Sequence, residues 1–184
     1  MKPTYTIVSA PEFCDRDTYA HTTSELLREA YEQDPTVIPH TFEEMLERYE
    51  WSVLAVLDNQ IVWQASVYAS HIPGHTHNEE IGSVVVDSRY GSMHIGNSLV
   101  TKLMYIRNMY KDIISATVNP KMYPIFEKNH FHQIEFPLEY LAEGEQYLAP
   151  KMKWWIEEFR AKARCYLNYS PMSRYPWRGG FFGD

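Results

Sequence analysis

The stretch from Glu79 to Val100, EEIGSVVVDSRYGSMHIGNSLV, constrains the fold of this chain more than any other. It contains three consecutive valines, Val84 to Val86, which are typical of a buried β-strand. A polar turn with two glycines follows, and beyond Gly96 apolar residues recur at helical spacing. A strand that passes through such a turn into a helix leaves backbone N–H groups that can bind an anion. The pattern indicates a phosphate-binding turn, but it lacks a GxGxxG fingerprint or a Walker A loop, and a purely structural turn fits it as well.

The rest of the chain predicts further strands and helices. Strands are expected over residues 4–9, 51–57, 60–70, 81–87, 112–118 and 131–136, with a hairpin turn at Asp58-Asn59. Helices are expected from a cap at Asp17 or Thr18 to before Asp34, over 41–50 with a Thr41/Glu44 capping box, for about four turns after Gly96, over 119–129, and over 151–167.

The order of these elements, with Asn119-Pro120 and the motif IFEKNHF near the end, resembles the GCN5-related N-acetyltransferase (GNAT) family over about residues 4–136. The resemblance implies an α/β fold in which helices flank a mixed, mostly antiparallel central sheet. We expect this domain to span residues 1–150. A C-terminal helix and aromatic tail over 151–184 would pack on the same domain or on a partner subunit.

The resemblance also implies acetyl-CoA as co-substrate, with its pyrophosphate in the turn and its pantetheine arm beside Asn119. At Asn119 a helix-capping role is an equal alternative. In this sequence, Gly91 stands where the family usually has Arg or Gln, and His94 stands where it has glycine. The residues implied in cofactor binding are Val84, Val85, Val86, Gly91, Ser92, Met93, His94, Ile95, Gly96, Asn97 and Asn119.

Acetyl transfer to an amine needs a proton acceptor, a polarised thioester carbonyl and a proton for the leaving thiolate. Glu80 is the predicted general base by resemblance, with a solvated strand end as the alternative; strand alternation places Glu79 on the opposite face. Backbone N–H groups near Val85 and Val86 would polarise the carbonyl. Phe126 stands where the family carries its proton-donating tyrosine, so Tyr123, one helical turn earlier, or a water molecule would replace it.

We therefore expect an N-acetyltransferase that acts on an unidentified amine by direct transfer in a ternary complex. The alternative is a catalytically weak or inactive acyl-CoA-binding or protein-interaction module, for which the altered turn and Phe126 are the reason. Transfer of a longer acyl group is a third alternative, with the aromatic C-terminal segment as a wall of the site.

Composition narrows the partners. A formal net charge of −7 argues against nucleic acid, and no apolar run reaches the roughly 20 residues that span a bilayer. The first residues lack the apolar core of a secretory signal, so a cytoplasmic protein is expected. His71, His75 and His77 have no further ligand nearby, and no metal is predicted. Trp154, Trp155, Phe159 and Tyr166 on the expected last helix favour a homodimer.

Overall fold

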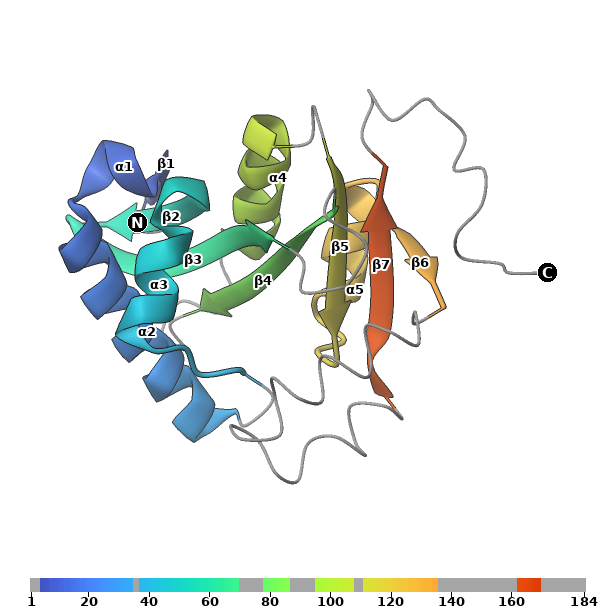
Figure 1. Cartoon of the computed structure of the whole chain (residues 1–184), viewed down its shortest axis with the longest axis horizontal. Helices are drawn as coiled ribbons and strands as arrows, with labels where there is room; N and C mark the ends of the chain where they lie inside the picture. The colour runs from blue at the N-terminus through green and yellow to red at the C-terminus, as the bar shows by residue number, and fades with distance from the viewer. Residues whose placement is uncertain are drawn as a thin grey trace.

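The computed structural model describes residues 4–34, 37–69, 78–86, 95–107, 111–135 and 162–169. These residues form a seven-stranded sheet in the order β1-β2-β3-β4-β5-β7-β6, in which β4 and β5 are parallel and the other neighbours antiparallel (Figure 1). The strands are β1 Thr6–Ser9, β2 Ser52–Leu57, β3 Gln60–Ala69, β4 Asn78–Val86, β5 Asp112–Thr117, β6 His132–Ile134 and β7 Arg164–Asn168. The predicted mixed, mostly antiparallel sheet is confirmed.

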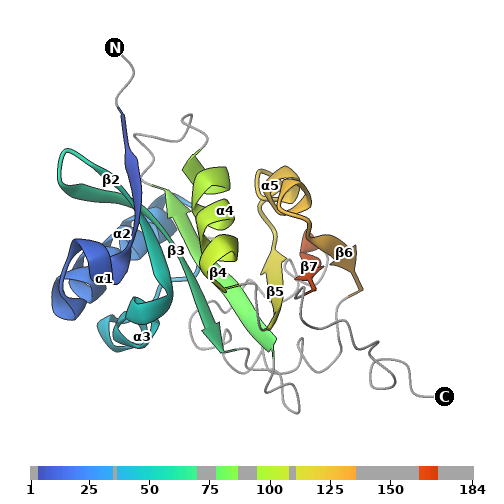
Figure 2. The same cartoon turned by 90° about the horizontal axis from the view of Figure 1, so that it is seen from above.

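Helices cover both faces of this sheet. Figure 2 shows α4 and α5 on one side and α1, α2 and α3 on the other. Their bounds are α1 Ala10–Phe13, α2 Arg16–Gln33, α3 Phe42–Arg48, α4 Ile95–Arg107 and α5 Tyr123–Lys128, with a 3₁₀ turn η1 at Tyr49–Trp51. The first face is called the α4 face below, and the second the α2 face.

Local sequence signals explain most of these boundaries. Asp58 and Asn59 both have positive φ, as a tight hairpin between β2 and β3 requires, and the Thr41/Glu44 capping box opens α3; both predictions are confirmed. The cap of α2 was predicted two or three residues too late. Asp15 is the N-cap, because its carboxylate accepts a hydrogen bond from the Thr18 amide at 2.9 Å.

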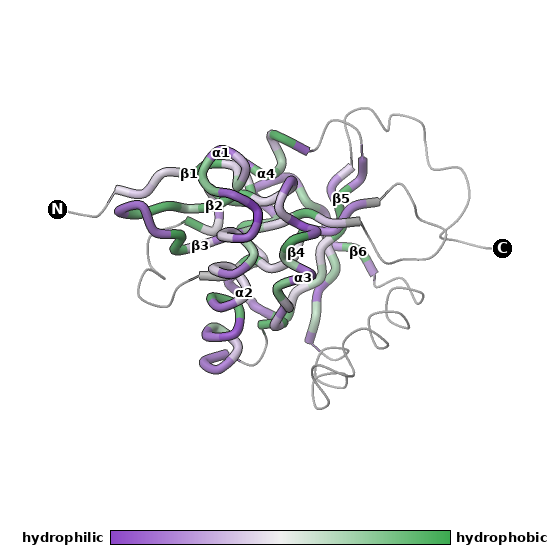
Figure 3. The backbone as a smooth tube through the Cα atoms, turned by 60° about the vertical axis from the view of Figure 1, so that its left-hand side comes forward, coloured by the Kyte–Doolittle hydropathy of each residue, from purple (hydrophilic) through white to green (hydrophobic). Residues whose placement is uncertain are grey.

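Apolar residues gather on both sides of the central strands. Figure 3 shows hydrophobic colouring along these strands and hydrophilic colouring along much of α2. The larger cluster, on the α4 face, includes Trp63, Leu99, Phe126 and Tyr166. The smaller one, on the α2 face, is built around Tyr19, Leu27, Met45 and Leu54.

The expected helix over 151–167 is wrong at its end, where residues 164–168 form β7 between β5 and β6. Cys165 packs with Ile114 on one face of the sheet, while Tyr166 enters the larger cluster on the other. This alternation of period two overrides the helix-forming Lys, Arg and Ala residues around it. Tyr166 therefore belongs to the sheet rather than to a helical aromatic surface. Trp154, Trp155, Phe159 and the tail beyond 169 lie outside the described residues.

Within the described part of the chain, no helix is both long and apolar enough to cross a membrane. The same residues contain no group of three or more His, Cys, Asp or Glu side chains that could hold a metal ion. His71, His75 and His77 lie outside the described residues.

Candidate active site

The strands β4 and β5 separate after a short parallel contact. They pair only at Asn78↔Asp112, Glu79↔Ile113 and Glu80↔Ile114. Beyond this point β4 continues beside β3 and β5 continues beside β7, so the two strands diverge (Figure 1). The Ser115 hydroxyl donates to the Ile81 carbonyl at 3.1 Å where the separation begins. Among the described residues, the facing edge of β4 beyond Ile81 thus has no ladder partner, and its backbone polar groups can meet a ligand.

A β-bulge changes the direction of the β4 backbone along this free edge. Gln64 pairs with Val85 and Ser66 with Gly82, so β4 carries one extra residue over this interval. Ser83 in the bulge has a φ of 53°, which is uncommon for a residue other than glycine. Bulges are frequent next to functional sites because they change the direction of a side chain or of a backbone group.

The N-terminus of α4 supplies three further backbone donors. The amides of Ile95, Gly96 and Asn97 lie in its first turn, where no acceptor within the helix can reach them, and the helix dipole favours an anion there. Predicted residues Gly91, Ser92, Met93 and His94 lie outside the described residues, as do the side chains of Val85 and Val86.

Gly96 has a packing role that the sequence did not reveal. A Cβ on Gly96 would lie 3.2 Å from the Ile125 Cδ1 atom and 3.7 Å from the ring of Trp63. The missing side chain therefore lets α4 approach α5 and β3 closely. The side chain of Asn97 accepts a hydrogen bond from Asn129 Nδ2 at 3.2 Å, which ties the start of α4 to the end of α5.

Asn119 lies in the connection from β5 to α5, and Tyr123 is the first residue of α5. Asn119 Oδ1 accepts from the Lys121 amide at 3.0 Å, so its side chain orders the turn before α5. The capping alternative is wrong, because the N-cap of α5 is Met122. The Tyr123 hydroxyl donates to the Lys162 carbonyl at 3.4 Å, and the guanidinium of Arg164 lies 4.2 Å from the centre of its ring.

Within the described part of the chain, two enclosed donors have no acceptor: the indole N–H of Trp63 and the hydroxyl of Tyr166. The ring of Trp63 lies beside Gly96, and its Cα pairs with Val86 near the end of β4. The Cα of Tyr166 pairs with Ser115, next to the point where β4 and β5 separate. Buried donors without partners are rare and costly, so these two indicate a place where a ligand acceptor belongs.

Tyr166 also packs directly against Phe126, with ring centres 5.3 Å apart. Burial raises the pKa of Tyr166, and a side-chain hydrogen bond from Arg164, followed by the charge of Arg164, partly opposes this shift. Its hydroxyl is therefore protonated at neutral pH. Sequence reasoning missed this position because the segment around it was expected to be helical.

The adjacent glutamates at the start of β4 have different surroundings. The carboxylate of Glu79 is buried on the α4 face, where Arg107 binds it with two N–H groups and the Lys111 ammonium lies at 3.3 Å. Glu80 therefore belongs to the α2 face, where its Cα pairs with Tyr68 of β3. The prediction that the two carboxylates point to opposite faces is confirmed.

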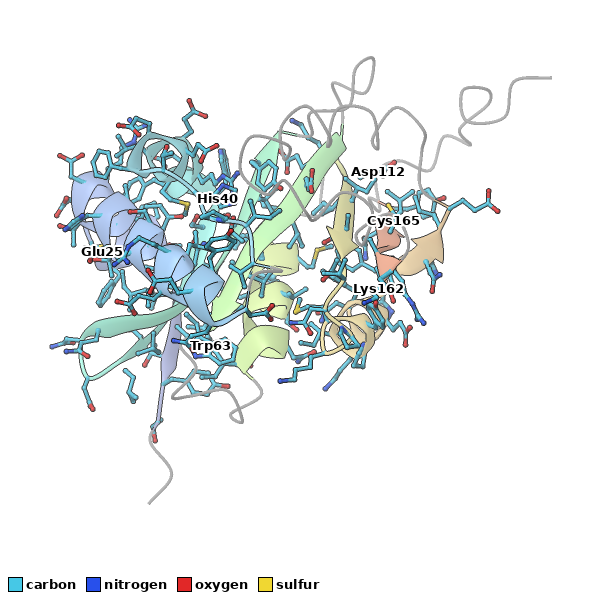
Figure 4. All side chains as sticks on the ribbon, turned by 90° about the horizontal axis from the view of Figure 1, so that it is seen from below. Glu25, His40, Trp63, Asp112, Lys162 and Cys165 are labelled. Atoms are coloured by element: carbon cyan, nitrogen blue, oxygen red, sulfur yellow. The ribbon has the colours of Figure 1, made fainter. Side chains whose placement is uncertain are left out.

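The negative charge of Glu80 also affects the thiol of Cys165 in β7. Figure 4 labels Cys165. Burial, followed by the negative charge of Glu80, raises the pKa of the Cys165 thiol to about 12. Glu80 thus lies near the Ile114–Cys165 side of the α2 face, at the start of the strand separation.

A buried polar network occupies the α2 face next to the bulge. Arg48, at the end of α3, donates from Nη1 to Ser83 Oγ and to His40 Nε2, the latter at 3.1 Å (Figure 4 labels His40). Its guanidinium lies 4.1 Å from the centre of the Tyr68 ring. Gln64 Nε2 donates to the Ser83 carbonyl at 2.9 Å, and so connects β3 to the same bulge.

Gly82 is required by this arrangement, since a Cβ there would lie 2.6 Å from the Tyr68 hydroxyl and 2.8 Å from its ring. The sequence also contains a pattern that indicates this network. Gln64, Ser66 and Tyr68 alternate with Trp63, Ala65 and Val67 along β3, so polar side chains share one face of a strand that is buried from Ile61 to Val67.

Of the comparisons with known proteins, the one with solved structures found proteins that share this geometry. No family model and no curated protein matches the sequence. Among solved structures, Rv2747 from Mycobacterium tuberculosis in complex with CoA and NLQ matches with a TM-score of 0.60 and 14% identity, over 89% of this chain and 98% of the other.

Two further structures extend the comparison. N-acetylglutamate synthase from Neisseria gonorrhoeae, complexed with coenzyme A and N-acetyl-glutamate, matches with a TM-score of 0.57 and 12% identity, over 92% of this chain and 36% of the other. A GNAT superfamily phosphinothricin acetyltransferase from Sinorhizobium meliloti in complex with AcCoA matches with a TM-score of 0.56 and 14% identity, over 73% of this chain and 77% of the other. At these identities the likeness concerns the fold, and this chain has the fold of the GNAT acetyltransferases.

Proposed function

We propose that this protein is an acetyl-CoA-dependent N-acetyltransferase that transfers the acetyl group directly to an amine in a ternary complex. The observation that carries the proposal is the separation of β4 from β5 beyond Glu80 and Ile114, with the first turn of α4 beyond the end of β4. Three solved structures of the same fold hold CoA or AcCoA, which supports this choice of co-substrate.

Acetyl-CoA fits the donors that the chain leaves without partners. The amides of Ile95, Gly96 and Asn97 suit the pyrophosphate, together with the predicted turn residues Gly91, Ser92, Met93 and His94. The free edge of β4 over Val84–Val86 suits the acetyl carbonyl and the adjoining arm. Trp63 Nε1 and Asn119 would donate to carbonyl groups of that arm.

In this proposal Glu80 accepts the proton of the amine. The position of Glu80 beside the start of the strand separation, on the face opposite the paired Glu79, supports this role. Backbone N–H groups of β4 beyond the bulge stabilise the negative charge that develops on the thioester oxygen. A tyrosine returns a proton to the sulfur of the leaving CoA.

Two tyrosines compete for that last role. Tyr123, the sequence-based candidate, already donates to the Lys162 carbonyl and stacks against Arg164. Tyr166 has a protonated, enclosed hydroxyl without an acceptor and packs on Phe126, which occupies the family's tyrosine position. We favour Tyr166 for this reason, and Tyr123 remains the second candidate.

Single Tyr→Phe substitutions separate the two candidates. Tyr166→Phe should lower kcat about 10-fold or more at constant acetyl-CoA affinity, whereas Tyr123→Phe should leave kcat unchanged. The opposite result assigns the proton to Tyr123. If both variants retain full kcat, neither tyrosine donates it and water does.

The function itself is tested by incubating the protein with acetyl-CoA and a panel of amines. Release of free CoA thiol and formation of an acetylated amine, identified by mass spectrometry, are expected. Acetyl-CoA binding without product from any amine would instead support the non-catalytic acyl-CoA-binding alternative. Replacing acetyl-CoA with longer acyl-CoA donors in the same assay examines the third alternative, and the homodimer and cytoplasmic location remain predictions.

A further inference from the structure

We propose that Arg48 binds a carboxylate of the acceptor, so that the acceptor is an amine of the amino-acid type. This inference rests on the proposed function, because it assigns the acceptor side of the same site. It is carried by the hydrogen bonds, burial and charge balance of Arg48 and by its position relative to Glu80.

The guanidinium of Arg48 is buried, and only one of its three nitrogen atoms donates hydrogen bonds to described residues. The residue is only 5% exposed, and both of its hydrogen bonds to described residues, to His40 Nε2 and Ser83 Oγ, come from Nη1. Its Nε and Nη2 atoms donate to no described side chain or carbonyl. These two atoms form the edge of a guanidinium that binds a carboxylate with two parallel hydrogen bonds.

The charge of Arg48 is equally uncompensated within the described part of the chain. No carboxylate forms an ion pair with it there. Since arginine can only donate, His40 Nε2 accepts, and the proton of His40 lies on Nδ1, which faces Glu44 at 3.5 Å. Glu44 therefore contacts His40 rather than Arg48 itself. A buried cation without a direct anion is costly, and an acceptor carboxylate would remove that cost.

Arg48 and Glu80 lie on the same face of the sheet with Tyr68 between them. The guanidinium stacks on the Tyr68 ring, and the Cα of Tyr68 pairs with that of Glu80. Directly opposite residues on one face have side chains in contact range, so the Tyr68 ring brings the guanidinium of Arg48 and the carboxylate of Glu80 to the same part of this face. An amino acid presents an amine and a carboxylate in the same arrangement. Glu80 would receive the amine, and Arg48 would receive the carboxylate.

Matched acceptor pairs test this inference on the wild-type protein. L-phenylalanine and phenethylamine share a side chain and differ in the carboxylate, as do L-leucine and 3-methylbutylamine. A charged hydrogen-bonded contact predicts a kcat/KM about 10-fold to 100-fold higher for the amino acid of each pair. Equal values, or a preference for the decarboxylated amines, would overturn the proposal.

Substitution of Arg48 then tests whether this residue causes the preference for amino acids over decarboxylated amines. In Arg48→Met, which keeps the length of the side chain, the two members of each pair should be used equally well and the KM for the amino acid should rise. Acetyl-CoA affinity should not change. Arg28→Met is the matched control, because it removes the same charge from an exposed ion pair with Glu32, and it should leave the preference intact. If Arg48→Met does not fold, the wild-type panel decides alone.

Failure of the proposed function gives a different result from failure of this inference. If no amine is acetylated, calorimetry of the CoA-bound protein with N-acetyl-L-phenylalanine and N-acetylphenethylamine still measures carboxylate binding. Tighter binding of the carboxylate that Arg48→Met abolishes supports the subsite without transfer. Equal or absent binding of the two compounds rejects it.

Discussion

The two faces of the sheet are built from the same strands but use opposite chemistry. Along β3, Trp63, Ala65 and Val67 enter the apolar cluster of the α4 face. On the α2 face, the buried Gln64 joins a polar network with Tyr19, Ser52, His40 and Arg48. The buried Ser66 beside it donates to the Gly82 carbonyl. Apolar packing suffices to hold a sheet against a helix, whereas a buried network specifies where each polar group lies. The α4 face therefore combines most of the apolar packing with the proposed cofactor donors, whereas the α2 face positions charges beside the bulge of β4.

Glu79 and Glu80 provide the sharpest test of this comparison. Glu80→Gln should lower kcat by roughly 100-fold to 10,000-fold, because it removes the proposed general base, and should leave acetyl-CoA affinity and stability about the same. Glu79→Gln should lower the free energy of unfolding by about 3 kcal/mol, since it leaves Arg107 and Lys111 without their buried anion. Steady-state kinetics and urea unfolding of both variants measure these effects. A loss in kcat of less than threefold for Glu80→Gln at every pH would assign the base to another group.

Gly82 tests whether the position of the Tyr68 ring matters for the site. Gly82→Ala forces that ring away, because the new Cβ would lie 2.6 Å from its hydroxyl. We expect a loss of about 1–3 kcal/mol in the free energy of unfolding and a higher KM for the acceptor, since Arg48 loses the surface on which it stacks. The double variant Gly82→Ala/Tyr68→Ala should lack this clash and recover part of the stability, but not the KM. Full stability in Gly82→Ala would show that the ring moves without cost.

The sequence predicted the elements that local patterns define. The valines of β4, the Asp58-Asn59 hairpin, the capping box of α3 and the period of α4 predicted the order of the elements up to β6, except for the short α1 and η1. The family resemblance predicted the type of sheet. The end of the last predicted helix was wrong, because Arg164–Asn168 contains good helix formers and its strand state depends on pairing with β5 and β6.

The candidate site was predictable only in part. Glu80 was predicted as the general base from the family resemblance and from strand alternation. Its position on the face opposite the ion-paired Glu79 agrees with that prediction. Arg48 could not be found in this way, because it becomes part of the site only when α3 packs against the bulge at Ser83. The unpartnered hydroxyl of Tyr166 likewise depends on contacts with Phe126 that are distant in sequence.

Cys165 reports on the charge of Glu80 with a smaller effect. Its pKa in the folded protein is raised to about 12, whereas a thiol in the unfolded chain titrates near 8.5. The unfolded state therefore binds fewer protons between these values, and the contribution of Cys165 to stability falls as the pH rises through this window. Unfolding measured from pH 8 upward should show a shallower decline in Cys165→Ala than in the wild type.

Glu80→Gln extends this test to the geometry of the α2 face. Without the negative charge of Glu80, the pKa of Cys165 should fall but stay raised by burial, which is the larger cause. Alkylation rates of Cys165 as a function of pH, measured in a Cys14→Ser background, provide the comparison. An unchanged Cys165 profile would mean that the two side chains are too far apart to interact.

Calorimetric titration of the wild-type protein with acetyl-CoA tests the central claim most directly, because every proposed role depends on acetyl-CoA lying where β4 and β5 separate. The account predicts one site per chain. It also predicts that CoA competes for this site and that Glu80→Gln and Arg48→Met leave it intact. No heat of binding at high micromolar acetyl-CoA, from protein that is folded by circular dichroism, would contradict the account.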